Sequence, residues 1–190
     1  MQLMASNVLG RLLIVVAAAA LFAACADQNP ASPRLASGNA AQLNRSRENH
    51  ADPNLEAAVE TLRRVTGRYH NIENAKKDNF VLLHDCETRL NDEPVGTVYV
   101  NLSRLMDGVI DLEKPDALIY EPGPTGLTLV GVELAIPYAL WPQSEPPTLL
   151  GATFQREDEF GVFALHAWVW RSNPNGLFEE TNPRVRCDAP

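Results

Sequence analysis

Residues 117–136 have the sequence ALIYEPGPTGLTLVGVELAI, and this stretch holds the clearest structural signal in the chain. Two apolar runs, 117–121 and 127–136, flank the segment PGPTG at 122–126. Proline presets the backbone for a turn, and glycine reaches conformations that other residues avoid, so this segment favours a tight reversal. The stretch therefore predicts two neighbouring antiparallel strands.

On both sides of this hairpin the sequence has the same texture, with short runs of β-forming residues separated by Pro, Gly and Asp. Such runs are typical of strands. Besides the hairpin, we expect strands over residues 80–86, 96–102 and 161–171. The proline-rich segment 137–150 is expected to lie over the surface as a connection, because proline cannot donate a hydrogen bond within a central strand.

Ahead of the strands lies the best helix signal in the chain. Asp52 is placed to cap the helix and Pro53 to occupy its first position. From Leu55 onward, apolar residues recur at helical spacing, which predicts a helix over 53–77 with a weak point at Gly67. A helix followed by strands predicts an α+β domain, with the N-terminal helix packed on a four- to five-stranded, mainly antiparallel sheet.

The first residues have the pattern of an export signal. An apolar run over 12–24 follows Arg11 and ends in small residues before Cys25. As a helix this run is about 20 Å long, well short of the ~30 Å that a membrane span needs. The segment LFAAC at 21–25 resembles a bacterial lipobox, although Phe22 replaces the usual leucine. Ordinary cleavage near Cys25 and an uncleaved anchor are the alternatives.

We therefore expect a signal peptide over 1–24 and a lipid such as palmitate on Cys25, which would attach the protein to a membrane. Ala26, rather than aspartate, after the cysteine favours the outer membrane where the host has two membranes. Residues 26–51 are polar and lack hydrophobic periodicity, so 25–51 is interpreted as the lipidated cysteine with a flexible tether. Residues 52–190 are then long enough for one globular domain.

Two further cysteines, Cys86 and Cys187, remain for the exported domain. An even pair in an oxidising compartment predicts a disulfide. Two buried free thiols are the plain alternative. A catalytic Cys86 is a third, because His84 lies two residues away and would share a strand face with it.

The charge of the chain bears on its partners. The 190 residues include 24 acidic and 16 basic ones, a net charge of −8. Binding to phosphate backbones needs clustered Lys and Arg, so nucleic acid is not an expected partner. The hydrophobic share of 45% and charged share of 21% are those of a globular protein.

The sharpest candidates for chemistry are His166 and Glu133, which are ionisable residues within apolar runs. If their strands are neighbours, Glu133 could orient the imidazole of His166, and His84 could complete a metal site or an acid–base pair. A hydrogen-bonded polar pair inside the core, or a solvent-facing Glu133, explains the same pattern without function. Common catalytic motifs, such as Gly-x-Ser-x-Gly and His-Glu-x-x-His, are missing from the sequence.

Three tryptophans are weaker candidates. Trp168, Trp170 and Trp141 would suit a pocket for an apolar or sugar-like ligand, with Trp141 as a lid, but tryptophans are also common core residues.

The C-terminal third carries four distinctive motifs: GLTLVGVELAIP at 126–137, LHAWVW at 165–170, NPNGLF at 173–178 and NPRVRC at 182–187. As a set they resemble a family of uncharacterised bacterial secreted proteins and lipoproteins, over roughly residues 65–187. The resemblance implies export and no particular activity. That family has a histidine in a Gly-x-His-Tyr segment where this chain has Val98, so a role resting on that histidine does not carry over.

These observations predict a cell-envelope lipoprotein with a non-catalytic domain that binds a small ligand or an envelope partner. The alternative is a metal-dependent or acid–base enzyme that uses His166 and Glu133. A purely structural envelope protein is a third class, and it predicts no pocket around the tryptophans. No cofactor is expected.

Overall fold

A computed structural model describes residues 52–89 and 93–188 of the chain. The chain divides into two units, Met1–Asn44 and Arg45–Pro190, and every described residue belongs to the second. The predictions of a signal peptide, of a lipid on Cys25 and of a tether lie outside the described residues. Within the described part of the chain, no helix is long and apolar enough to span a membrane.

The N-terminal helical region is broken into three pieces: α2 (Pro53–Thr66), the 3₁₀ turn η1 (Gly67–His70) and α3 (Ile72–Lys77). Asp52 caps α2 and Pro53 begins it, as the sequence predicts. The helix expected over 53–77, with or without a kink, is instead interrupted, because Asn71 adopts an extended backbone and uses its side chain to cap α3. The weak point expected at Gly67 is where α2 ends.

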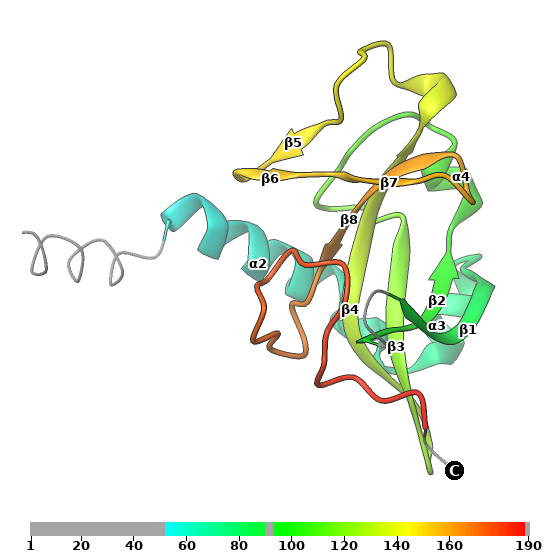
Figure 1. Cartoon of the computed structure of the whole chain (residues 1–190). Helices are drawn as coiled ribbons and strands as arrows, with labels where there is room; N and C mark the ends of the chain where they lie inside the picture. The colour runs from blue at the N-terminus through cyan, green and yellow to red at the C-terminus, as the bar shows by residue number, and fades with distance from the viewer. Residues whose placement is uncertain (1–51, 90–92, 189–190) are drawn as a thin grey trace, which may run out of the picture. The chain divides into compact units, whose positions relative to one another are not determined.

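Six antiparallel strands form one curled sheet (Figure 1). In spatial order they are β1 (Val81–Arg89), β2 (Glu93–Val100), β3 (Ala117–Gly123), β4 (Gly126–Pro137), β8 (Val162–Ala167) and β7 (Gln155–Glu157). A separate pair, β5 (Thr148–Leu149) and β6 (Ala152–Thr153), lies in the connection before β7. The α+β class and the antiparallel sheet are confirmed.

The predicted number of four to five strands is too low. The extra strand, β7, has the sequence QRE, which is too short and too polar to show any hydrophobic pattern. The last predicted strand, 161–171, is too long, because β8 ends at Ala167. There the regular pairing stops, because the N–H of Trp168 donates to the carbonyl of Leu177. Contact with β4 resumes irregularly, since the N–H groups of Trp170 and Arg171 both donate to the carbonyl of Val130.

The predicted hairpin is β3 and β4, which pair from Ala117 opposite Glu133 to Gly123 opposite Gly126. Because side chains alternate along β4, the sheet has two different sides. On the first face Val132, Leu134 and Ile136 join buried apolar clusters that also contain Leu118, Tyr120, Phe163 and Leu165. On the second face lie Glu133 and Ala135, beside apolar groups that include Val98, Ile119, Ala164 and Trp168.

The curl of the sheet brings its two ends together over the second face. His84 of β1 lies with its ring centroid 6.1 Å from that of Phe160, which follows β7. A short helix, α4 (Leu102–Leu105), follows β2, and Leu105 packs against the apolar groups of the second face. The second face is therefore the floor of a hollow rather than an open surface.

Candidate functional site

A cavity of about 180 Å³ lies on the second face, enclosed by the curl of the sheet and by α4. Its apolar walls come from four separate parts of the chain, represented by Leu83, Leu102, Ala135 and the pair Phe160 and Val162. A cavity of ~150 Å³ with such walls is large enough to bind benzene. The size and lining therefore suit a compact apolar group.

The mouth of the cavity is apolar and faces solvent. Leu102 is 55% exposed, and Leu83 and Phe160 are exposed as well. Leu102 is held there because Asn101 caps α4, accepting hydrogen bonds from the backbone N–H groups of Ser103 and Arg104. Large apolar side chains left in water at the edge of a cavity are typical of a binding site.

Two carboxylates, Asp116 and Glu133, lie in the wall of this otherwise apolar cavity. Asp116 comes just before β3, and its N–H donates to the carbonyl of Glu133 at 3.0 Å, so the two residues are neighbours across the β3–β4 pair. The carboxylate of Asp116 accepts a hydrogen bond of 2.8 Å from the N–H of Ala135. This contact extends the pairing of β3 and β4 to the residue before the start of β3, where Pro115 precedes Asp116.

Asp116 is only 1% exposed. Burial raises the pKa of its carboxyl group from 3.8 to about 7, because the charged form loses its hydration. The hydrogen bond from Ala135 opposes this rise, and the charges of Glu133 and Asp107 add to it. Asp116 is thus an acid that changes charge near neutral pH inside an apolar cavity.

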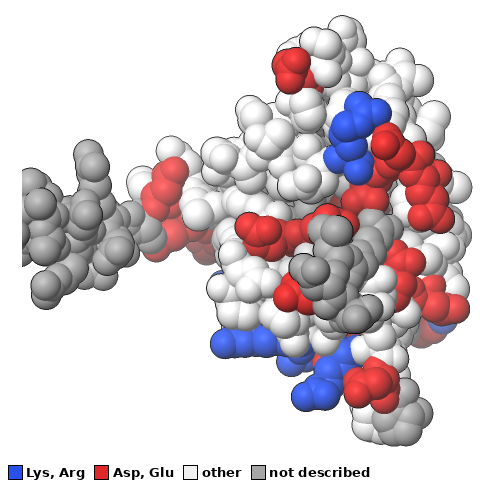
Figure 2. Space-filling model, in the orientation of Figure 1, with Lys and Arg blue, Asp and Glu red and all other residues white. Residues whose placement is uncertain are grey.

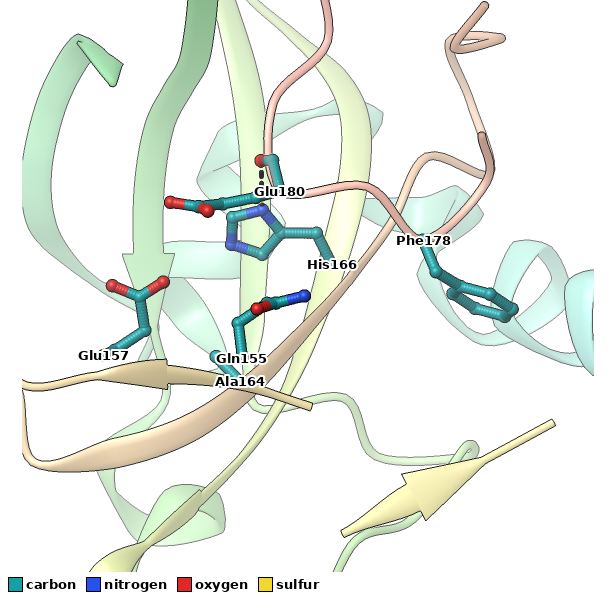
Figure 3. Close-up of a pocket in the computed structure, with 6 residues that line it drawn as sticks. All are labelled: Gln155, Glu157, Ala164, His166, Phe178 and Glu180. Carbon is teal, nitrogen blue, oxygen red and sulfur yellow. Dashed lines mark hydrogen bonds between the residues drawn. The ribbon is translucent and has the colours of Figure 1, made fainter. Parts of the chain in front are cut away.

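The structure brings together the two sequence candidates Glu133 and His166. They are register partners on β4 and β8, and Nε2 of His166 lies 3.2 Å from Oε2 of Glu133. The other ring nitrogen, Nδ1, donates to the backbone carbonyl of Glu180 at 2.6 Å (Figure 3). Burial alone would lower the pKa of His166, but the hydrogen bond and charge of Glu133 outweigh it, so the pKa is raised.

Both ring nitrogens of His166 are therefore engaged. Because a carbonyl only accepts, Nδ1 carries a proton, and the raised pKa favours a second proton on Nε2 facing Glu133. Figure 3 shows the imidazole among Gln155, Glu157 and Glu180, in a depression with no room for a water molecule. This is the arrangement of a satisfied ion pair in a core, and a catalytic role of His166 and Glu133 stays a prediction.

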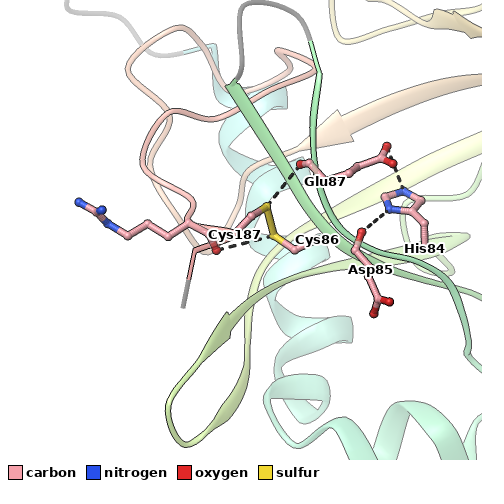
Figure 4. Close-up of a disulfide and its surroundings, with 6 residues drawn as sticks. His84, Asp85, Cys86, Glu87 and Cys187 are labelled. Atoms are coloured by element: carbon pink, nitrogen blue, oxygen red, sulfur yellow. Dashed lines mark hydrogen bonds and ion pairs between the residues drawn. A yellow bond between two sulfur atoms is a disulfide. The ribbon is translucent and has the colours of Figure 1, made fainter. Parts of the chain in front are cut away.

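The disulfide between Cys86 and Cys187 is confirmed, with a Cα–Cα distance of 5.3 Å (Figure 4). It joins β1 to the C-terminal tail. The alternatives of two free thiols and of a catalytic Cys86 are wrong, because a sulfur in a disulfide is not a free nucleophile.

His84 lies apart from His166. Its Nδ1 is 2.8 Å from the carbonyl oxygen of Asp85, and its Nε2 is 3.8 Å from Oε1 of Glu87 (Figure 4). Over residues 52–89 and 93–188, no three His, Cys, Asp or Glu residues gather as metal ligands would. The suggestion that His84 completes a metal site with His166 has no support from this placement.

The three tryptophans lie in three different places. Trp168 is buried on the second face, and its Nε1 donates to the carbonyl of Glu179. Trp170 donates to the hydroxyl of Thr66, and Trp141 donates to the carbonyl of Glu145. None of them lines the 180 Å³ cavity, so a shared tryptophan pocket is not what the fold forms here.

Asp116 is the site residue that sequence reasoning missed. The only signal for it is an acid placed between Pro115 and the apolar start of the hairpin, in DALIY. Such an acid usually ends a loop in solvent, and nothing local shows that this one is buried. Figure 2 shows acidic side chains spread over the middle of one face of the molecule.

No family model, curated protein or solved structure matches the chain.

Proposed function

We propose that this protein is a cell-envelope lipoprotein whose domain binds a small, largely apolar ligand without catalysing a reaction. The observation that carries the proposal is the 180 Å³ cavity with apolar walls and an exposed apolar mouth. A monomeric protein seldom keeps apolar side chains in water around a cavity unless something binds there.

The location rests on the N-terminal sequence. The apolar run over 12–24, the LFAAC segment and the polar stretch that follows favour export, lipidation of Cys25 and attachment to a membrane, with the outer membrane favoured in a host with two. The disulfide supports export, because such bonds persist in oxidising compartments. The cavity would then collect its ligand outside the cytoplasm.

We also propose that α2 packs on the first face of the sheet and stiffens the wall behind the cavity. Leu62 of α2 is buried in the same cluster as Leu118 and Tyr120. Nε of Arg63 donates to the carbonyl of Val169 at 2.7 Å, which supports the same packing.

The binding proposal is tested with toluene, which has no charge and matches the size of the cavity. Toluene added to the purified protein should shift the amide NMR signals of Ala135 and Val162, which line the cavity, and leave distant signals in place. Leu102→Ser should weaken binding several-fold, because it removes part of the apolar mouth.

The matched control is Val109→Ser. Val109 is 56% exposed, as Leu102 is at 55%, but it does not line the cavity, so its loss should not change toluene binding. Toluene shifts scattered over the whole molecule, or equal effects of the two variants, would contradict the proposal.

The anchor is tested by the intact mass of the protein from membrane and soluble fractions, beside a Cys25→Ala variant. A mass increment of lipid size, lost together with membrane association in Cys25→Ala, is the expected result. A soluble product without lipid would instead make this a freely secreted protein.

The alternative of a metal-dependent enzyme is separated by metal analysis. We expect purified protein to fold and to contain no stoichiometric metal. Bound metal that disappears in His166→Ala would favour the enzyme, since it would mean that His166 of the unmodified protein binds the metal instead of pairing with Glu133.

A further inference from the structure

We infer that the cavity on the second face selects a ligand with a protonated amino group attached to a compact apolar body. This inference rests on the proposed function and names the chemical class of the ligand. It follows from the position of two carboxylates in a wall that is otherwise apolar.

The two carboxylates come from neighbouring positions. Asp116 and Glu133 are linked through the backbone at 3.0 Å, and both line the cavity together with Ala135. An apolar group held between Leu102, Phe160 and Val162 therefore has acidic side chains in the wall around it. A ligand with an apolar body and one cationic end matches both parts of this lining.

The charges that face Asp116 leave the cavity wall negative. Glu133 and Asp107 are acidic, and the basic neighbour is Arg104. The charge of Arg104 lowers the pKa of Asp116, but its hydrogen bonds go to other groups: its Nη1 donates to the carbonyl of Pro115 at 2.9 Å, and its guanidinium lies 4.9 Å from the ring centre of Phe80. The positive charge of His166 offsets the negative charge of Glu133 but not that of Asp116.

Asp116 also keeps acceptor capacity. Its Oδ2 accepts the hydrogen bond from Ala135, whereas an ionised carboxylate has about four acceptor positions on its two oxygens. A buried carboxylate is stabilised most by a cationic donor, which supplies both a charge and hydrogen bonds. An anionic ligand would meet repulsion from the ionised form of Asp116, while His166 offsets the charge of Glu133.

Three ligands with the same ring and different head groups test the inference on the protein as the cell produces it: benzylamine, benzyl alcohol and benzoate. We expect benzylamine to bind about tenfold more tightly than benzyl alcohol, since a hydrogen bond to a charged partner is the stronger kind. Benzoate should bind more weakly than the alcohol. Methylamine, which has the charge without the ring, should bind far more weakly than benzylamine.

The variant that isolates the head group is Asp116→Asn, which keeps the shape of the side chain and the acceptor for Ala135. It should reduce benzylamine binding to the level of benzyl alcohol and leave the alcohol unchanged. Glu145→Gln is the control, because Glu145 is an exposed acid that does not line the cavity, and it should change neither affinity.

The pH dependence gives an independent readout. Because Asp116 must lose its proton to pair with a cation, benzylamine affinity should rise between about pH 5.5 and 8, while the affinity of benzyl alcohol stays flat or falls. This comparison uses unmodified protein, so it holds even if a variant fails to fold.

Equal binding of amine and alcohol, equal binding of methylamine and benzylamine, or a preference that survives in Asp116→Asn would overturn the inference. If toluene still binds in these cases, the proposed function stands while the inference fails. If toluene, benzylamine, benzyl alcohol and benzoate all fail to bind, the proposed function fails and the inference fails with it.

Discussion

At the scale of single residues, Asp116 links the fold to pH. Its folded-state pKa of about 7 lies above the ordinary value of 3.8, so between these values the folded protein keeps a proton that the unfolded chain releases. Stability therefore falls as pH rises through this window, by at most about 4 kcal/mol.

The prediction is that Asp116→Asn flattens this decline, because asparagine keeps the hydrogen bond to Ala135 without a titrating group. Denaturant unfolding at pH 4, 5.5, 7 and 8 measures it. Equal slopes for the two proteins would show that Asp116 is not the group responsible.

His166 also has a raised pKa, but its protonated form carries a charge, whereas the protonated form of Asp116 is neutral. The pKa of His166 is raised by Glu133 against the effect of burial, so the pair contributes stability below the unfolded-state pKa of histidine, near 6.5, and loses it as pH rises through the folded value. Glu133→Gln removes the partner and should cost about 3 kcal/mol at pH 5, and less at pH 8.

Unfolding experiments at the two pH values check this, with Glu145→Gln as an exposed control. An NMR titration should also show that the pKa of His166 falls in Glu133→Gln. A cost that is the same at both pH values would mean that the pair is not charged in the folded protein.

Gly96 of β2 lies where there is no room for a side chain. Its φ is +110°, and a Cβ atom there would lie 2.8 Å from the carbonyl oxygen of Tyr120 and 2.9 Å from the side chain of Ile119. Gly96→Ala should therefore destabilise the fold by at least about 2 kcal/mol.

Gly126 provides the comparison, because its φ is +119° but a Cβ atom there would meet no neighbouring group within 4 Å. Gly126→Ala carries only the backbone strain, so thermal unfolding should show a smaller loss than Gly96→Ala. Equal losses would mean that close packing of β2 on β3 is not the cause.

At the scale of elements, the disulfide ties an edge strand to the C-terminal tail. Among the described strands, β1 pairs only with β2, and its register is interrupted at three points, so regular strand pairing holds it on one side only. The bond between Cys86 and Cys187 spans 101 residues of sequence and restricts the unfolded chain accordingly.

Replacing both cysteines by serine should lower the free energy of unfolding, by up to about 4–5 kcal/mol in the chain-entropy account. Urea unfolding of the unmodified protein with and without reductant should give the same difference. An unchanged midpoint under reduction would mean that the sheet holds β1 without the bond.

The cavity also depends on this element. Leu83 of β1 and Phe160 after β7 come from opposite ends of the sheet and line the same cavity. The disulfide therefore supports the wall of the binding site as well as the fold.

At the scale of the whole molecule, ligand binding and stability are one equilibrium. A ligand that binds only the folded protein adds about 1.4 kcal/mol to its stability at ten times its Kd. Benzylamine should therefore raise the melting temperature of the unmodified protein. Asp116→Asn should show a smaller rise at the same concentration, as a thermal melt would reveal.

Much of the local structure could be predicted from sequence. The start of α2 at Pro53 follows from its cap, and the β3–β4 hairpin follows from PGPTG. The disulfide follows from the pair of cysteines that remains once Cys25 is assigned to the anchor. Each signal depends on residues close together in the chain or on composition alone. The same is true of the predicted export signal and lipid anchor, which lie outside the described residues.

The sequence predicts that Glu133 and His166 lie close together only if their strands are neighbours, and sequence alone does not show that they are. The cavity, the burial of Asp116 and the separation of the tryptophans were not predictable, because each depends on contacts between distant parts of the chain. Local sequence sets how each segment is built. Only the curl of the sheet, which brings Leu83 to Phe160, decides that an acid beside a loop becomes part of an enclosed apolar wall.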